Sequence, residues 1–420
     1  MSTAAAGLPG GISQKRARVL GLVFIALSLG IFWWFALGSE SGLSSTFKLS
    51  SGNEFVTVPD LSLPARSTAL FLGTIAAFLG GLQIARGFGN KTYLVLGAVV
   101  LCFILAFLVW AARDRSLNML GMLSSTLLRA VPLTLGALSG VLCERAGVIN
   151  IAIEGMMLTA AFTGAIAASA IGNLWIGLLA GIASGALLGL LLAVLSIRYR
   201  VDQIIGGTVI NIFALGLTSY LSARVFSSYQ NLNSPGRFSV IEIPLLSKIP
   251  IIGPIFFSNN IFIYLMYALV AVIAFAMFRT RWGLRVRAVG EHPKAADTVG
   301  IKVLRVRYQN VVLGGMVAGL AGAYFTLGSV GRFDENMTAG RGFIALAAMI
   351  FGRWHPVGAF GAALLFGFAD SLQNKLAILK VPIASEFLLM APYLVTIFVV
   401  AGVVGRARPP AADGQPYTKE

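Results

Sequence analysis

Residues 279–302, RTRWGLRVRAVGEHPKAADTVGIK, concentrate ionisable side chains in a chain that is otherwise 57% hydrophobic. Apolar runs flank this basic stretch on both sides. An island of this kind inside an apolar protein contacts a membrane surface, a partner protein or solvent. Its charged residues are the cations Arg279, Arg281, Arg285, Arg287, Lys294 and Lys302 and the acids Glu291 and Asp297.

Motifs for catalysis and nucleotide hydrolysis are missing from the sequence. No G-x-x-x-x-G-K-[ST] loop occurs, and the nearest stretch, GFGNKT at 87–92, lacks the Gly-Lys pair in register. HExxH and CxxC motifs are also missing, and the histidines, His292 and His355, fit no Ser-His-Asp set. We therefore expect no catalytic residue, no metal site and no cofactor on this chain.

Three carboxylates lie in or beside apolar runs, where a charge is expensive and is usually kept for function. Glu144 and Glu154 flank a break between apolar runs, and Asp370 lies near the end of another run. They are the candidates for coupling transport to a proton or a sodium ion. A channel, a secondary carrier and the membrane subunit of a pump with a separate ATPase all stay open at this point.

The composition is that of a membrane protein. Charged residues make up 11%, mean hydropathy is +0.85, and several segments can each cross a bilayer core of about 30 Å. The net charge of +16 comes from cations in short loops between apolar runs, which follows the positive-inside rule and argues against a nucleic-acid binder. The pattern predicts a multi-pass protein with both termini cytoplasmic. Cys102 and Cys143 form no ligand pattern.

The fold expected from these runs is an all-α, polytopic membrane bundle with roughly 10–12 crossings or part-crossings, interrupted helices and an internal repeat. Residues 1–115 form an N-terminal extension with three spans, the first at about 19–37 and too long for a signal-peptide core. Residues 116–405 form the transmembrane core, whose last span lies at about 386–404. Residues 406–420 form a cytoplasmic tail.

Glycine spacing predicts tight packing between helices. Small residues at four-residue intervals let helix backbones approach in a bilayer. The repeats are Gly181, Gly185 and Gly189, and Gly315 and Gly319.

Two apolar runs, 131–143 and 341–352, are too short to cross a bilayer comfortably. Each is followed by a polar or helix-breaking stretch, ERAG at 144–147 and RWHP at 353–356, and then by another apolar run. Paired interrupted segments indicate an internal repeat with the substrate path at its interface. The alternative is that both are ordinary cytoplasmic hairpins between short, packed helices.

The basic stretch contains the pattern of two short helices. The first ends near Gly290, and Pro293 fits the first position of a second helix that Gly300 would end. Ala295 and Ala296 make its face small and smooth. Such a helix suits a groove on a partner protein, and the alternative is a solvated loop that only anchors the topology.

Two stretches resemble a known family. GLRVRAVGEHPKAADTVGIKV is similar to the cytoplasmic coupling loop of bacterial ABC importer permeases: Ala295, Ala296 and Gly300 match the spacing of its EAA–Gly loop, although Lys294 stands where many members have Glu. VPLTLGALSGVLCERAGVINIAIEGMML resembles the subgroup for branched-chain amino acids, simple sugars and nucleosides. ERAGVINIAIEGMM and FGRWHPVGAFGAALLFG look most like its nucleoside and simple-sugar permeases. The resemblance covers about residues 116–405.

The resemblance implies an ATP-driven importer of nucleosides or related simple sugars in the bacterial cytoplasmic membrane. Branched-chain amino acids are the alternative substrate, and a self-contained ion-coupled carrier is the alternative class. The implied partners, besides membrane lipid, are cytoplasmic ABC ATPases that use the ATP, a second identical or homologous permease, and an extracellular substrate-binding lipoprotein. The residues implied in ATPase coupling lie in loop 279–307 and are Arg287, Gly290, Glu291, Pro293, Ala295, Ala296 and Gly300.

Polar and aromatic residues at the breaks and on nearby spans are candidates for the substrate path. Amides and carboxylates could hydrogen-bond a sugar, and aromatic rings could stack on a base. The alternatives are hydrogen bonds that only cross-link helices and a Trp that only anchors the chain at the interface. The candidates are Asn150, Glu154, Thr208, Asn211, Phe351 and Trp354.

Overall fold

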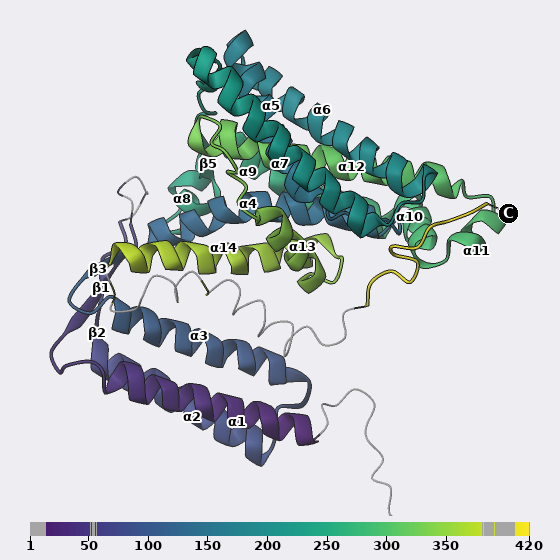
Figure 1. Cartoon of the computed structure of the whole chain (residues 1–420). Helices are drawn as coiled ribbons and strands as arrows, with labels where there is room; N and C mark the ends of the chain where they lie inside the picture. The colour runs from purple at the N-terminus through teal and green to yellow at the C-terminus, as the bar shows by residue number, and fades with distance from the viewer. Residues whose placement is uncertain are drawn as a thin grey trace, which may run out of the picture. The chain divides into compact units, whose positions relative to one another are not determined.

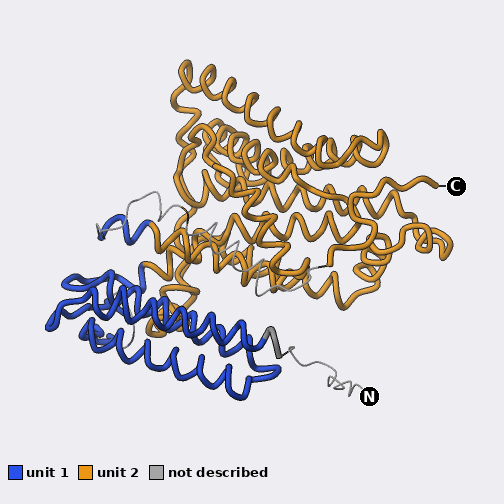
Figure 2. The backbone as a smooth tube through the Cα atoms, turned by 60° about the horizontal axis from the view of Figure 1, so that its bottom comes forward, with its two compact units in different colours: residues 1–121, 374–388 blue, residues 122–373, 389–420 orange. Residues whose placement is uncertain are grey.

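The computed structural model describes residues 14–50, 52, 55, 57–379, 381, 390 and 408–419, and most of these residues are helical (Figure 1). The predicted all-α membrane bundle is therefore confirmed. The chain divides into two compact units: residues 1–121 with 374–388, and residues 122–373 with 389–420 (Figure 2). The last predicted span, at 386–404, lies outside the described residues.

Three long helices and a small sheet form the first unit. The sheet has strand order β2-β1-β3, with β1 antiparallel to β2 and parallel to β3. Its elements are α1 (Gln14–Gly30), the π-helical η1 (Ile31–Ala36), β1 (Ser44–Lys48), β2 (Leu61–Pro64), α2 (Ala65–Ala85), the 3-10 turn η2 (Gly89–Lys91), α3 (Thr92–Ala111) and β3 (Ser116–Asn118).

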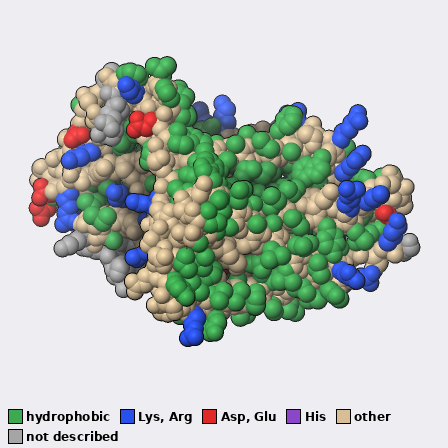
Figure 3. Space-filling model, turned by 90° about the horizontal axis from the view of Figure 1, so that it is seen from above, with side chains coloured by type: hydrophobic (Ala, Val, Ile, Leu, Met, Phe, Trp, Pro, Cys, Tyr) green, Lys and Arg blue, Asp and Glu red, His purple; other side chains and the backbone are tan. Residues whose placement is uncertain are grey.

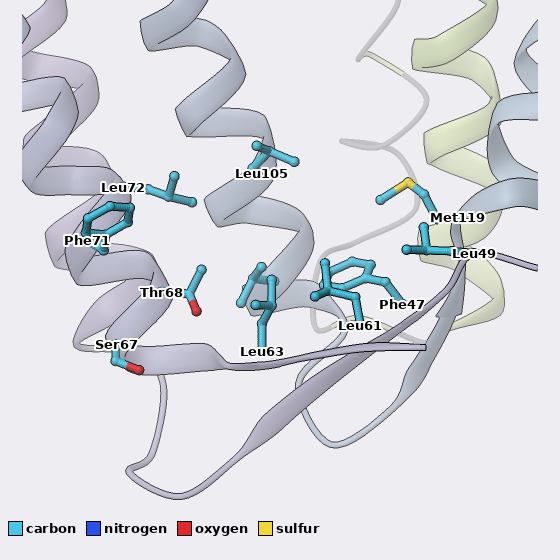
Figure 4. Close-up of a pocket in the computed structure, with 11 residues that line it drawn as sticks. Phe47, Leu49, Leu61, Leu63, Ser67, Thr68, Phe71, Leu72, Leu105 and Met119 are labelled. Carbon is cyan, nitrogen blue, oxygen red and sulfur yellow. The ribbon is translucent and has the colours of Figure 1, made fainter. Parts of the chain in front are cut away.

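A cavity of about 500 Å³ opens in the first unit between the sheet, α2 and α3 (Figure 4). Its lining is almost entirely apolar, with Phe47 and Leu61 from the sheet, Phe71 from α2 and Leu105 from α3. None of the residues predicted for the substrate path lines it.

Long helices dominate the second unit, where α5, α6 and α12 run side by side (Figure 1). Among the described residues of the whole chain, nine helices are long and apolar enough to cross a membrane. The described α-helices from residue 119 onward, short ones included, are α4 (Met119–Glu144), α5 (Ile153–Ile171), α6 (Leu174–Ala193), α7 (Gln203–Ser228), α8 (Ile252–Phe256), α9 (Ile261–Arg279), α10 (Arg281–Glu291), α11 (Pro293–Thr298), α12 (Val303–Ala323), α13 (Arg341–Phe351) and α14 (Pro356–Ile378).

Shorter elements connect or extend these helices. Two π-helical segments continue α6 and α12 without a break. They are η3 (Val194–Arg198) and η6 (Tyr324–Val330). The stretch between α7 and α9 contains the 3-10 turns η4 (Gln230–Asn233) and η5 (Leu246–Lys248) and the paired strands β4 (Ile241–Glu242) and β5 (Ser258–Asn259).

Glycines set the close approach of α6 to α12. A Cβ atom added at Gly185 would lie 2.4 Å from the carbonyl oxygen of Gly315, and one added at Gly319 would lie 2.5 Å from that of Gly181. Real Cβ atoms essentially never come closer than 3.0 Å to another heavy atom. The tight helix packing predicted from the glycine spacing is confirmed.

The prediction of a short segment at 131–143 is wrong, because α4 is one continuous helix of 26 residues with Pro132 inside it. A proline removes the N–H that would bond to the carbonyl four residues earlier, here that of Leu128. That carbonyl accepts a hydrogen bond from Tyr324 Oη at 2.9 Å instead. A neighbouring helix thus satisfies the freed group, as membrane helices with an internal proline require.

The second interrupted segment matches its prediction. α13 has 11 residues and is followed by a turn and then by α14. In this turn Arg353 and Trp354 take φ values of 55° and 52°, in the left-handed region that non-glycine residues seldom occupy. The internal repeat stays a prediction.

Candidate coupling and transport site

Two short helices form the basic stretch, as predicted. Thr280 caps the start of α10, where its Oγ1 accepts a hydrogen bond from Gly283 N, and Pro293 occupies the first turn of α11. Gly300, just beyond the end of α11, has φ of 84°, the left-handed conformation that ends helices. His292 Nδ1 caps α11 by accepting from Ala295 N at 3.1 Å. Sequence reasoning missed this cap because histidine is not a usual N-cap residue.

The two faces of α11 differ in exposure. Ala296 is buried and packs with Val289 and Val303, which come from α10 and α12. Ala295 is exposed, and Val299 is 74% exposed. In Figure 3, Lys and Arg side chains gather at the end of the molecule where α10 and α11 lie. α11 and the residue after it therefore present the small apolar side chains of Ala295 and Val299, with Lys294 and other cations around them.

Gly290 brings α10 against the first break. A Cβ atom at Gly290 would lie 2.3 Å from the carbonyl oxygen of Arg145 and 3.4 Å from Gly147 N. Only glycine permits this approach, since a backbone carbonyl cannot rotate away as a side chain can. The basic stretch is therefore in direct contact with the chain that follows α4.

Arg145 joins this contact to the second break. Its Nε donates to Trp354 O at 3.0 Å, and its Nη2 donates to Arg353 O at 3.1 Å. Its guanidinium also lies over the ring of Phe278, 5.4 Å from the centroid. Burial lowers the pKa of Arg145, and the nearby Glu291 opposes that shift. The predicted sites did not include Arg145, although it lies within the ERAG break.

Glu144, the last residue of α4, contacts the same turn. Trp354 Nε1 donates to Glu144 Oε2 at 2.6 Å, and both side chains are buried. The ends of α4 and α13 are therefore linked by a side-chain hydrogen bond as well as by Arg145. The predicted path residue Trp354 lies at this junction.

Glu154 and Asn211 both form hydrogen bonds at the start of α5. Glu154 accepts hydrogen bonds from Gly340 N at 2.8 Å and from Gly342 N at 2.5 Å, and so caps the N-terminus of α13. Asn211 Oδ1 accepts from Gly155 N at 2.8 Å, and its Nδ2 donates to Ile151 O at 2.9 Å. These two predicted path residues tie α5, α7 and α13 together.

The remaining predicted path residues each contact different partners. Asn150 is fully buried and donates to Ser139 Oγ at 3.3 Å. Phe351 stacks on Phe366 of α14, with ring centroids 5.4 Å apart. Thr208 is exposed and donates to the carbonyl of its own helix, four residues earlier.

The chain belongs to the family described as "Branched-chain amino acid transport system / permease component", which matches residues 122–400. It is a multi-pass membrane protein and a permease of this family. Permeases of this kind are transport subunits and do not hydrolyse ATP themselves. No solved structure matches the chain significantly.

Curated relatives cover most of this region. The chain is 43% identical over 304 residues to the guanosine ABC transporter permease protein NupQ of Bacillus subtilis, covering 70% of this chain and 95% of the relative. It is 40% identical over 306 residues to the nucleoside ABC transporter permease protein NupC of Lactococcus lactis, covering 70% and 96%. It is 34% identical over 327 residues to the putative glucose ABC transporter permease protein TsgC13 of Haloferax volcanii, covering 71% and 98%.

Proposed function

We propose that this chain carries nucleosides through the bacterial cytoplasmic membrane as the permease subunit of an ABC importer. The observation that carries the choice of substrate is the identity of 43% and 40% to permeases named for guanosine and nucleosides, over 95% and 96% of their lengths. The relative named as a putative glucose permease is less similar, at 34%. Simple sugars and branched-chain amino acids are therefore the weaker alternatives.

The contacts of α10 and α11 support ATPase coupling through the basic stretch. α11 exposes Ala295 and Val299 for a partner, while Ala296 packs against α10 and α12. α10 in turn touches Arg145, which donates hydrogen bonds to the carbonyls of Arg353 and Trp354 in the second break. A push on α11 by a closing ATPase would therefore reach the ends of α4 and α13 through rigid contacts. Packed elements of this kind shift between discrete arrangements instead of deforming continuously.

An ion-coupled carrier finds less support, because each of its candidate carboxylates has a protein partner. Glu144 accepts from Trp354, and Glu154 accepts from two backbone N–H groups. Asp370 pairs with Arg129 Nη1 at 2.5 Å. A carboxylate that carries a coupling ion must release such partners in every cycle.

The proposal includes partners and orientation. The basic stretch faces the cytoplasm, as do both termini, since cations gather at cytoplasmic ends of membrane helices. Two ABC ATPases would supply the hydrolysis of ATP, a second permease would complete the pathway, and an extracellular lipoprotein would deliver the nucleoside. We expect no cofactor on this chain.

The experiment is uptake of labelled guanosine, other nucleosides, glucose and leucine by cells that express this chain with its partner subunits. Val299→Asp places a charge on the exposed end of α11, and Val240→Asp, at a residue 60% exposed in the stretch between α7 and α9, is the matched control. We expect nucleoside uptake to be lost in Val299→Asp and kept in Val240→Asp at equal amounts of protein in the membrane. Normal uptake in Val299→Asp would remove α11 from the coupling path, and uptake of leucine or glucose alone would refute the substrate.

A further inference from the structure

The described residues near the end of the chain, 408–419, form hydrogen bonds with α10 and α12. Ala412 N donates to Gly290 O at 2.9 Å, and Ala411 N donates to the carboxylate of Glu291 at 3.2 Å. From α12, Arg307 Nη1 donates to Gln415 O at 2.8 Å. This 408–419 segment, which sequence reasoning treated as a simple tail, therefore bonds to α10 and α12.

The segment also contributes to the apolar packing of α11. Tyr417 is 7% exposed and belongs to one buried cluster with Val289 of α10, Ala296 of α11 and Val303 of α12. Ala296 is the residue of α11 that packs inward, so Tyr417 belongs to the cluster that holds the helix the ATPase would push. Without Tyr417 the inner face of α11 would lose a large apolar neighbour.

A third set of contacts reaches the first break. A Cβ atom at Gly147 would lie 3.1 Å from Ala412 O, so the segment runs directly against the break. The carboxyl group of Asp413 lies beside that of Glu144. Burial raises the pKa of Asp413 to about 6, and the nearby Arg307 guanidinium opposes that shift. Glu144 accepts a hydrogen bond from Trp354, so the segment lies beside the junction of the two breaks.

From these contacts we propose that the 408–419 segment is a brace that fixes α10 and α11 to the ends of α4 and α13, with Tyr417 and Asp413 as its positioning residues. The inference rests on the proposed function, because the motion it transmits is that of a partner ATPase. In its absence α11 could move under the ATPase without carrying the breaks with it. Hydrolysis of ATP would then continue with little transport.

The test compares Tyr417→Ala and Asp413→Lys with Lys419→Ala, an exposed change in the same segment. Nucleoside uptake per ATP hydrolysed is measured in proteoliposomes that hold the complete importer, and amide hydrogen exchange of residues 281–300 is measured in the same preparations. We expect exchange in α10 and α11 to be about tenfold faster in the first two variants, because a local contact is lost. We expect uptake per ATP to fall at least about fivefold in these variants while the ATPases stay bound, since a small displacement of a positioning contact can cost up to about 100-fold.

The outcomes separate the brace from the proposed substrate. Faster exchange with unchanged uptake per ATP would make the contacts merely structural and overturn the brace, as would unchanged exchange. A loss of protein from the membrane, with normal uptake per remaining copy, would also overturn it. If the unmodified chain transports no nucleoside, the proposed substrate is wrong. Amide hydrogen exchange and substrate-free ATP hydrolysis, measured in the variants, still decide whether the brace links α11 to the ATPases.

Discussion

Gly290→Ala is the substitution that tests the contact between α10 and the first break most directly. The added Cβ would lie 2.3 Å from Arg145 O, whereas ordinary contacts begin at 3.4 Å, so α10 must move by roughly 1 Å. Overpacking of this kind costs about 1–3 kcal/mol. The gain in helix propensity from Gly to Ala, about 1 kcal/mol, offsets part of that cost. The net loss of stability should therefore be small, about 0–2 kcal/mol.

Transport should suffer far more than stability. A misplacement of about 1 Å at a positioning contact can cost up to 100-fold in rate, and we expect nucleoside uptake to fall at least tenfold. Uptake per copy and the midpoint of thermal unfolding are measured side by side. The control is Gly216→Ala in α7, where the added Cβ meets nothing within 4 Å. Gly290→Ala protein that transports at the unmodified rate would refute the role of this contact.

Other substitutions test separate contacts. Trp354→Phe removes the 2.6 Å hydrogen bond to buried Glu144. A thermal melt should show a loss of about 1–3 kcal/mol in the free energy of unfolding, and the loss should be smaller when Glu144→Gln is made in the same chain. Gly185→Ala would place a Cβ 2.4 Å from Gly315 O, so unfolding in detergent should occur at a lower temperature, and an unchanged midpoint would contradict the packing of α6 on α12. Burial raises the pKa of Asp413 to about 6, above the ordinary value near 3.9. The bound segment therefore holds a proton that the released segment loses. The attachment of the 408–419 segment should therefore weaken as pH rises from about 4 to about 6. Amide hydrogen exchange of the segment at pH 5 and pH 8 would show this weakening, and Asp413→Asn would abolish it.

The local features of the fold could be read from the sequence. Long apolar runs predict membrane helices because the bilayer fixes their length. Pro293 and Gly300 predicted the limits of α11, since each residue acts on its own backbone. The four-residue glycine spacing predicted close helices, because small residues at that interval let two helix backbones approach.

Long-range contacts could not be read in this way. The continuity of α4 depends on Tyr324, which supplies the donor that Pro132 lacks and lies far away in the sequence. The capping of α13 by Glu154 joins residues 186 and 188 positions apart. Asp413 lies in a short polar segment without any periodic signal. Only the folded chain shows that these residues meet.

The measurement that tests the central claim most directly is guanosine uptake into proteoliposomes containing this chain and its partner subunits. ATP is supplied on the side of the basic stretch, with and without an ionophore that collapses the proton gradient. Transport by an ABC importer should require ATP and be unaffected by the ionophore. Uptake that proceeds without ATP and stops when the gradient collapses would contradict the account.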